Sequence, residues 1–340
     1  MKDTFVITKQ SFLRLLDSIS KTHNVVSPYG DDNYIFETFN GSFTFNKYRA
    51  VTSIRQFLLP SQQLIEGYFQ EDSYYKRPFC VVGAKACDLQ SLKVQDYVFL
   101  DGDVDEDYKR MRENNIIISS DCTGFKDVCF CLALDINPYP EDMFDLNISP
   151  VDDIFIVDIG SEKGRKVVDN NRNLFQTVRD EYINERLNNR QRMLDSLKEN
   201  IKKQGLVPKG ALYELIKGGY ENDVWELKAK DCVECGACIM NCPTCHCFLL
   251  CDAKKDSQFV RGRIWDGCQY KNFSRVAGGA NPLKLRKERL RNRYIKKFEF
   301  FPDRIGVYAC TGCGRCIESC IGKIDLREIF RNLYSKKAKV

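Results

Sequence analysis

Two runs of four cysteines in the C-terminal third of the chain have the spacing of iron–sulfur ligands. Each run reads C-x2-C-x2-C-x3-C, a spacing in which three thiolates of a run bind one [4Fe–4S] cluster and the fourth binds the neighbouring cluster. We therefore predict two [4Fe–4S] clusters with crossed ligands. The first would be bound by Cys232, Cys235, Cys238 and Cys320, and the second by Cys310, Cys313, Cys316 and Cys242.

Glycine follows the second cysteine of each run, at Gly236 and Gly314. The chain must turn tightly there, and glycine tolerates the positive φ of such a turn. A pair of zinc sites is the alternative interpretation, but zinc sites usually combine two separated cysteine pairs. Transfer of single electrons is thus the chemistry that we expect of these residues.

A third set of cysteines lies in the N-terminal half of the chain. Side chains two residues apart point the same way in an extended backbone, so the thiols of the Cys-Phe-Cys motif can reach one centre. The other two cysteines follow predicted strands, at the end of the sheet where the loops of α/β proteins converge on a ligand. Buried free cysteines are the alternative. We predict a third [4Fe–4S] cluster on Cys87, Cys122, Cys129 and Cys131.

Five of the 17 cysteines fall outside these sets. Cys80 lies in a predicted buried strand and is interpreted as a packing residue. Cys245, Cys247 and Cys268 are interpreted as thiols that line the cluster domain, with a further metal site or a redox-active thiol group as the alternative. Cys251 receives no role.

Other chemistries lack the residues that they need. The stretch from Cys242 to His246 matches the C-x-x-C-H haem-attachment pattern, but Cys242 is already a predicted cluster ligand. The chain has no G-x-G-x-x-G, Walker A or H-E-x-x-H motif and only two histidines. We therefore predict that it is not catalytic by itself.

Apolar patterns indicate which elements position these cysteines. Residues 11–19 have helical spacing, and residues 78–83, 115–119 and 153–158 are short apolar runs typical of strands. Helical spacing then extends over about 170–203. More than sixty residues separate the two cysteine runs, which predicts extra helices between them. A closing amphipathic helix would present Leu326, Ile329, Phe330 and Leu333.

These elements predict an α+β fold in three parts. Residues 1–160 would form a mixed α/β domain that carries the third cluster, and residues 161–228 a helical linker. Residues 229–340 would form an α-helical dicluster ferredoxin-type domain. A chain of 340 residues is long enough for such an organisation.

Composition and charge indicate the cellular location and the classes of partner that we expect. The N-terminus has no secretory signal and no apolar stretch reaches membrane-spanning length, so we expect a cytoplasmic protein with reduced thiols. The formal charge is +5, and three clusters would add about −6. The basic stretch 284–297 is interpreted as a solvated helix face that also balances cluster charge or docks an acidic partner. We expect neither a nucleic-acid nor a membrane partner.

Several further blocks of sequence carry a resemblance to a known family. They are Ala86-Cys-Asp-Leu, Tyr97-Val-Phe-Leu, Cys129-Phe-Cys131, Phe144-Asp-Leu, Cys242-Pro-Thr-Cys-His-Cys247, Trp265-Asp-Gly-Cys268, Val276-Ala-Gly-Gly279, Arg291-Asn-Arg-Tyr294 and Gly312-Cys-Gly-Arg-Cys316. From about residue 75 to 330 the chain resembles the iron–sulfur β subunit of cytoplasmic sulfhydrogenase, a multi-subunit [NiFe] hydrogenase. The anaerobic sulfite reductase family shares most of these blocks in its electron-transfer subunit. Ile321 is one departure, because the family has proline there.

The resemblance implies an electron-transfer subunit with three [4Fe–4S] clusters. It would relay electrons between a flavin- and NAD(P)-binding reductase subunit on one side and a catalytic metalloenzyme subunit on the other, here that of a hydrogenase. It implies ligand roles for the three cysteine sets above and also matches Cys245, Cys247 and Cys268, whereas Cys80 and Cys251 have no counterpart in the family. Two alternatives stay open: a subunit of an anaerobic sirohaem sulfite reductase, and a thiol/iron–sulfur reductase that acts on a disulfide or sulfur substrate through Cys245, Cys247 and Cys268.

Overall fold

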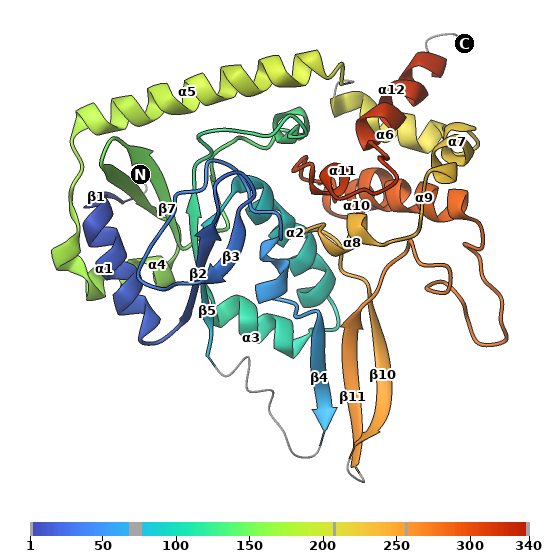
Figure 1. Cartoon of the computed structure of the whole chain (residues 1–340), viewed down its shortest axis with the longest axis horizontal. Helices are drawn as coiled ribbons and strands as arrows, with labels where there is room; N and C mark the ends of the chain where they lie inside the picture. Colours follow the sequence, from blue (N-terminus) through green and yellow to red (C-terminus); the bar gives the residue numbers. More distant parts are fainter. Residues whose placement is uncertain (1–2, 68–76, 207–208, 256–257, 338–340) are drawn as a thin grey trace.

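The computed structural model describes residues 3–67, 77–206, 209–255 and 258–337 (Figure 1). Within these residues the N-terminal part is built on an eight-stranded mixed sheet with the order β3-β2-β5-β6-β7-β8-β1-β9. Its strands are β1 (Thr4–Thr8), β2 (Asn24–Tyr29), β3 (Ile35–Thr38), β5 (Phe79–Ala84), β6 (Ile116–Ser120), β7 (Leu146–Val151), β8 (Ile154–Ile159) and β9 (Gln176–Thr177).

The centre of this sheet is parallel and its flanks are antiparallel. Strands β2, β5, β6 and β7 pair in parallel, and β5 and β6 are buried along their whole length. Buried parallel strands read as continuous apolar runs because both of their faces are covered. The strands predicted at 78–83, 115–119 and 153–158 are confirmed as β5, β6 and β8.

Helices cover both faces of the sheet. One face packs against α1 (Lys9–Ser20) and α4 (Glu162–Asn170), and the other against α2 (Ala86–Leu100) and α3 (Glu106–Asn114). Alternate residues of β5 divide between the two layers, since Cys80 packs with α1 whereas Val81 packs with α2. The Cys80 side chain is fully buried, so its predicted packing role is confirmed.

The long helix α5 (Asp180–Lys203) begins later than the sequence pattern predicts. The prediction of helix from residue 170 is wrong for its first part, which holds a short 3-10 turn at Arg172–Leu174 and strand β9. Phe175 is buried in the core beside the sheet, and β9 pairs with β1. Burial against the sheet therefore overrides the helical spacing. From there α5 runs along the molecule to the helical part (Figure 1).

The C-terminal part packs helices around an aromatic core. Its elements are α6 (Lys209–Gly218), α7 (Val224–Lys230), α9 (Arg286–Ile295), the π-helical segment η5 (Lys296–Phe300), α10 (Phe301–Ile305) and α12 (Leu326–Lys337). Trp225, Tyr294, Phe298 and Phe330 form the centre of this core. The closing helix is confirmed, because its four predicted apolar residues are all buried in the same core.

The region between the two cysteine runs contains the predicted extra helices and also an unpredicted hairpin. Strands β10 (Phe248–Lys255) and β11 (Gln258–Trp265) pair with each other, and β11 pairs with β4 (Gln62–Gly67) from the N-terminal half. This three-stranded sheet projects from the body of the molecule (Figure 1). Its pairing joins segments about two hundred residues apart, which local patterns do not reveal.

A membrane-spanning element is not found among the described residues. None of the helices there combines the length and the apolar character needed to cross a bilayer.

Candidate iron–sulfur sites

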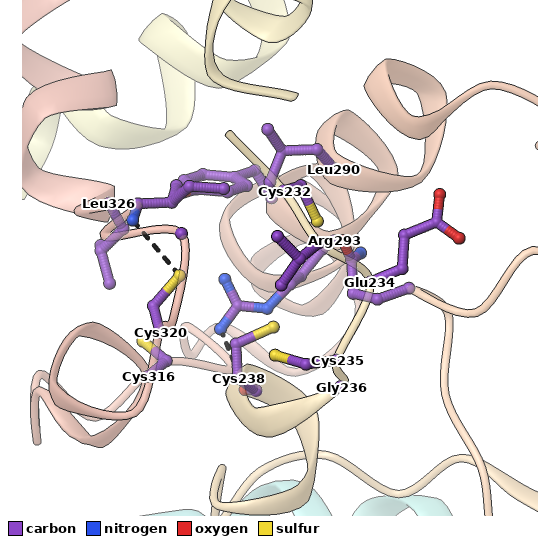
Figure 2. Close-up of a pocket in the computed structure, with 15 residues that line it drawn as sticks. Cys232, Glu234, Cys235, Gly236, Cys238, Leu290, Arg293, Cys316, Cys320 and Leu326 are labelled. Carbon is purple, nitrogen blue, oxygen red and sulfur yellow. Dashed lines mark hydrogen bonds between the residues drawn. The ribbon is translucent and has the colours of Figure 1, made fainter. Parts of the chain in front are cut away.

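The first predicted cysteine set lines one cavity in the C-terminal part (Figure 2). Three of its thiols come from the first run, around the short helix α8 (Ala237–Met240), and the fourth comes from the end of the second run. The backbone N–H of Ile324 donates a hydrogen bond to the Cys320 sulfur at 3.2 Å. The four residues brought together are Cys232, Cys235, Cys238 and Cys320.

The second predicted set lines an adjoining cavity. Its four thiols are those of Cys242, Cys310, Cys313 and Cys316. Arg293, Tyr294 and Cys316 line both cavities, so one wall separates them. The fourth cysteine of each run thus lies with the first three of the other run.

The two runs fold alike because each turns through a glycine. Gly236 has φ 76° and Gly314 has φ 72°, and each stands at the N-terminal end of a one-turn helix, α8 or α11 (Arg315–Glu318). This left-handed conformation strains residues that carry a Cβ atom. The predicted tight turns are therefore confirmed.

The third predicted set gathers at the carboxyl edge of the large sheet. Cys122, Cys129 and Cys131 pack together beneath Met193 and Leu197 of α5. Cys87 lies in the first turn of α2, after β5. Burial, followed by the charges of Asp88 and Cys313, raises the pKa of the Cys87 thiol well above its usual range. The third set thus lies beside the second cavity.

Gly312 brings the third set close to the second cavity. Its carbonyl oxygen accepts a hydrogen bond from the Phe130 N–H at 2.8 Å. A Cβ atom on Gly312 would lie 2.5 Å from the Cys131 Cα, and the residue has φ 63°. Only glycine therefore permits this approach of the two segments.

We expect Gly312→Ala to weaken this junction. A left-handed alanine costs about 1–2 kcal/mol, and the contact with Cys131 adds about 1–3 kcal/mol of overpacking. Thermal unfolding of the iron-loaded protein should show a lowered midpoint. Gly102→Ala is the matched control, because Gly102 has φ 79° with nothing within 4 Å of its Cβ position. Equal midpoints for the two variants would contradict the close approach.

Each of the three sets contains a buried thiol that suits a metal ligand better than a nucleophile. Burial raises the pKa of Cys122, Cys238 and Cys310 to about 12, so these thiols hold their protons until a metal displaces them. A reactive cysteine needs the opposite, a lowered pKa and exposure. The thiols of the first two sets also line cavity walls, as the ligands of a four-iron cluster must.

A buried hydrogen-bond donor without an acceptor also indicates that these cavities suit iron–sulfur clusters. Within the described residues, Arg293 Nε is buried and has no hydrogen-bond partner. It belongs to a side chain in the wall that the two cavities share. The thiolates and sulfides of [4Fe–4S] clusters are acceptors for such a donor. The residues present therefore fit two clusters at this place.

The basic stretch 284–297 contributes buried cations that the sequence pattern did not single out. Arg289, Arg293 and Lys297 follow one another at every fourth position and are each at most 6% exposed. The interpretation of a solvated helix face is wrong for these three residues, whereas Lys284 and Arg286 are exposed. The signal in the sequence was their helical spacing beside the buried Leu290, Tyr294 and Phe298.

Another buried arginine lies between the second and third cysteine sets. Arg315 is 1% exposed and forms an ion pair with Asp88 at 2.8 Å. Its Nε donates to the carbonyl oxygens of Ala50 and Val51 at 2.9 and 3.1 Å. Burial opposes its charge, but Asp88 and the Cys313 thiolate raise its pKa above the usual range. Arg315 therefore fastens the second run to the N-terminal part.

The extra thiols of the cluster domain do not form one group. The Cys245 thiol lies beside the Cys242 sulfur, whereas Cys247 lies beside Cys268. Burial raises the pKa of Cys247 to about 11. In the described part of the chain, no three His, Cys, Asp or Glu side chains are placed to hold a single metal ion. Cys251 lies exposed on β10.

The sequence was compared with known proteins. Residues 231–324 match the family described as "4Fe-4S dicluster domain". The chain is also similar to Sulfhydrogenase 2 subunit beta of Pyrococcus furiosus, with 31% identity over 248 residues, which cover 73% of this chain and 71% of that protein. The match includes far more than the dicluster region. The chain therefore belongs to the family of sulfhydrogenase iron–sulfur β subunits.

Proposed function

We propose that this chain is the electron-transfer subunit of a sulfhydrogenase-like hydrogenase complex. It relays single electrons between a flavin- and NAD(P)-binding reductase subunit on one side and a catalytic metalloenzyme subunit on the other. Three [4Fe–4S] clusters supply reversible one-electron chemistry when bound. We assign the outer C-terminal cluster to Cys232, Cys235, Cys238 and Cys320, the middle cluster to Cys310, Cys313, Cys316 and Cys242, and the N-terminal cluster to Cys87, Cys122, Cys129 and Cys131.

The observation that carries this proposal is the serial arrangement of the three cysteine sets. The two C-terminal cavities share a wall that contains Arg293 and Cys316. On the other side, Gly312 of the second run touches the backbone of Cys131. Sites that adjoin one another in series favour stepwise passage of electrons from one end to the other.

Each outer site has a route to the surface. Cys235 is exposed, and Cys122 lines a surface cavity of about 420 Å³ beneath α5. Two cysteines of the middle site, Cys242 and Cys313, are buried, as are Cys87 and Cys129 of the N-terminal site. The exposed Cys235 and the cavity at Cys122 support partner subunits that approach the two ends of the relay.

In this proposal the protein holds and tunes the clusters and performs no acid–base step. His246 is one of the chain's two histidines, and burial lowers its pKa to about 4. A neutral buried imidazole is a poor proton shuttle at neutral pH. The chain is therefore proposed to be non-catalytic by itself, in three parts: residues 1–160, 161–228 and 229–340.

Anaerobic purification of the native complex tests the proposal. Mass spectrometry of the associated subunits should identify a nickel-enzyme large subunit together with a flavin-binding subunit. The chain itself should carry about twelve irons. A control purification from cells that lack the affinity tag identifies proteins that adhere nonspecifically.

Two other results would change the assignment. A sirohaem subunit in the complex would move the function to sulfite reduction. A chain that purifies alone with all of its iron would contradict the subunit proposal and favour a free carrier or a thiol reductase. A thiol reductase would be labelled by alkylation at Cys247 or Cys268. The raised pKa of Cys247 argues against such labelling, because a reactive cysteine needs a lowered pKa.

A further inference from the structure

Two buried cations lie beside the middle cysteine set without a carboxylate partner. Arg293 and Lys297 are each 6% exposed and stand one helical turn apart. In the part of the chain that the structure describes, neither forms an ion pair with Asp or Glu. Their polar partners are the Cys238, Ala309 and Thr244 oxygens and the sulfurs of the cysteine sets.

Both cations lie close to cysteine sulfurs of the middle set. The Lys297 ammonium donates to the Cys242 Sγ at 3.3 Å, and the Arg293 guanidinium lines the same cavity as Cys316. Figure 2 shows the Arg293 side chain reaching among Cys238, Cys316 and Cys320. Cys242 and Cys316 are both assigned to the middle cluster, so both cations lie beside ligands of this cluster.

Burying an unpaired cation is costly unless an anion compensates it. A [4Fe–4S] cluster with four thiolates supplies about −2 charges when oxidised and one more when reduced. The two cations therefore favour the reduced cluster over the oxidised one.

The N-terminal set has weaker compensation. Arg315 lies beside it, but Asp88 neutralises that charge at 2.8 Å. Lys85 is a further buried cation placed beside Cys122, and its ammonium donates to the Ser120 hydroxyl and the Asp121 carbonyl oxygen at 2.7 and 2.9 Å. The outer C-terminal set faces Arg293 but not Lys297. Among the three sets, the middle one has the largest uncompensated positive charge.

We propose that Arg293 and Lys297 make the middle cluster the most readily reduced of the three, so that an electron in transit rests there. The inference depends on the ligand assignment of the proposed function. It gives the relay a holding point between its two ends. Charged hydrogen bonds to ligand sulfurs are one of the levers that set cluster potentials.

Redox titration of the iron-loaded complex, followed by electron paramagnetic resonance, tests this inference. The signal of the middle cluster should appear first as the potential is lowered. Variants Cys129→Ser and Cys232→Ser each remove one outer cluster and so assign the signals. Lys297→Met and Arg293→Met should each lower the reduced-to-oxidised ratio of the middle cluster by about tenfold at fixed potential, which is about 59 mV for one electron.

Two further variants separate charge from structure. Lys297→Arg keeps the charge and should restore the potential toward that of the unsubstituted protein. Arg289→Met is the matched control, since Arg289 is also buried on the same helix but pairs with Glu234 at 2.6 Å. It should leave the potential of the middle cluster unchanged.

The possible failures are distinguishable. If the protein holds three clusters and an outer cluster is reduced first, the inference is wrong but the proposed electron-transfer function still stands. The same holds if Lys297→Met and Arg293→Met retain full iron and an unshifted middle potential. Fewer than three clusters in the unsubstituted chain would instead overturn the ligand assignment, and the inference with it.

Discussion

Replacing Cys129 with serine should reduce the iron content from about twelve to about eight atoms per chain. Cys129 is buried beside Cys122 and Cys131 beneath α5, where a serine hydroxyl is a far poorer iron ligand than a thiolate. The expected product retains both C-terminal clusters. Metal analysis and the resonance spectrum of the reduced protein measure the loss, and transfer between the two partner subunits should stop.

Cys251→Ser is the control for this prediction. Cys251 is an exposed cysteine on β10 and belongs to none of the three sets, so its loss should leave iron unchanged. An iron content of about eight atoms in both the unsubstituted chain and Cys129→Ser would show that the N-terminal thiols are only packing residues. The relay would then have two clusters, and Cys122 would no longer mark one of its ends.

The crossed ligation of the two C-terminal clusters predicts an unusual result for double variants. Cys232 and Cys242 belong to one run but line different cavities. Cys232→Ser combined with Cys242→Ser should therefore remove about eight irons per chain. Cys232 and Cys320 belong to different runs but line the same cavity. Cys232→Ser combined with Cys320→Ser should remove only about four.

Uncrossed ligation reverses this outcome. If each run bound its own cluster, the first double variant would lose about four irons and the second about eight. The two double variants control for each other, because each removes two thiols from the same part of the fold. Iron analysis after anaerobic reconstitution measures both, and the single variants should each lose about four irons.

The basic stretch at 284–297 is not solvated along its whole length, because some of its basic residues are buried. Lys284 and Arg286 lie at the surface, whereas Arg293 and Lys297 reach the cysteine sets. Three clusters with about −6 charges in total need internal positive charge as well as solvent. The stretch therefore has an exposed part and a buried part, and in the proposed function the buried part balances the charge of the clusters.

The sequence alone determined which thiols belong to which C-terminal site. Cysteine spacing within a run is a local property, and the crossing of the fourth ligand follows from that spacing. The buried strands β5, β6 and β8 could also be predicted from the sequence, because short continuous apolar runs are typical of buried strands. The conformations of Gly236 and Gly314 followed from the same local reasoning.

Only the tertiary structure decided what lies between the sites. The hairpin β10–β11 pairs with β4 from the other half of the chain, and Phe175 is buried against the sheet where helical spacing predicted a helix. Arg293, Lys297 and Arg315 gained their roles from burial beside thiols that are distant in sequence. The electrostatic environment of a buried cation depends on which groups the fold places next to it. Local cysteine spacing therefore predicts the ligands, whereas packing of segments distant in sequence sets the environment of each site.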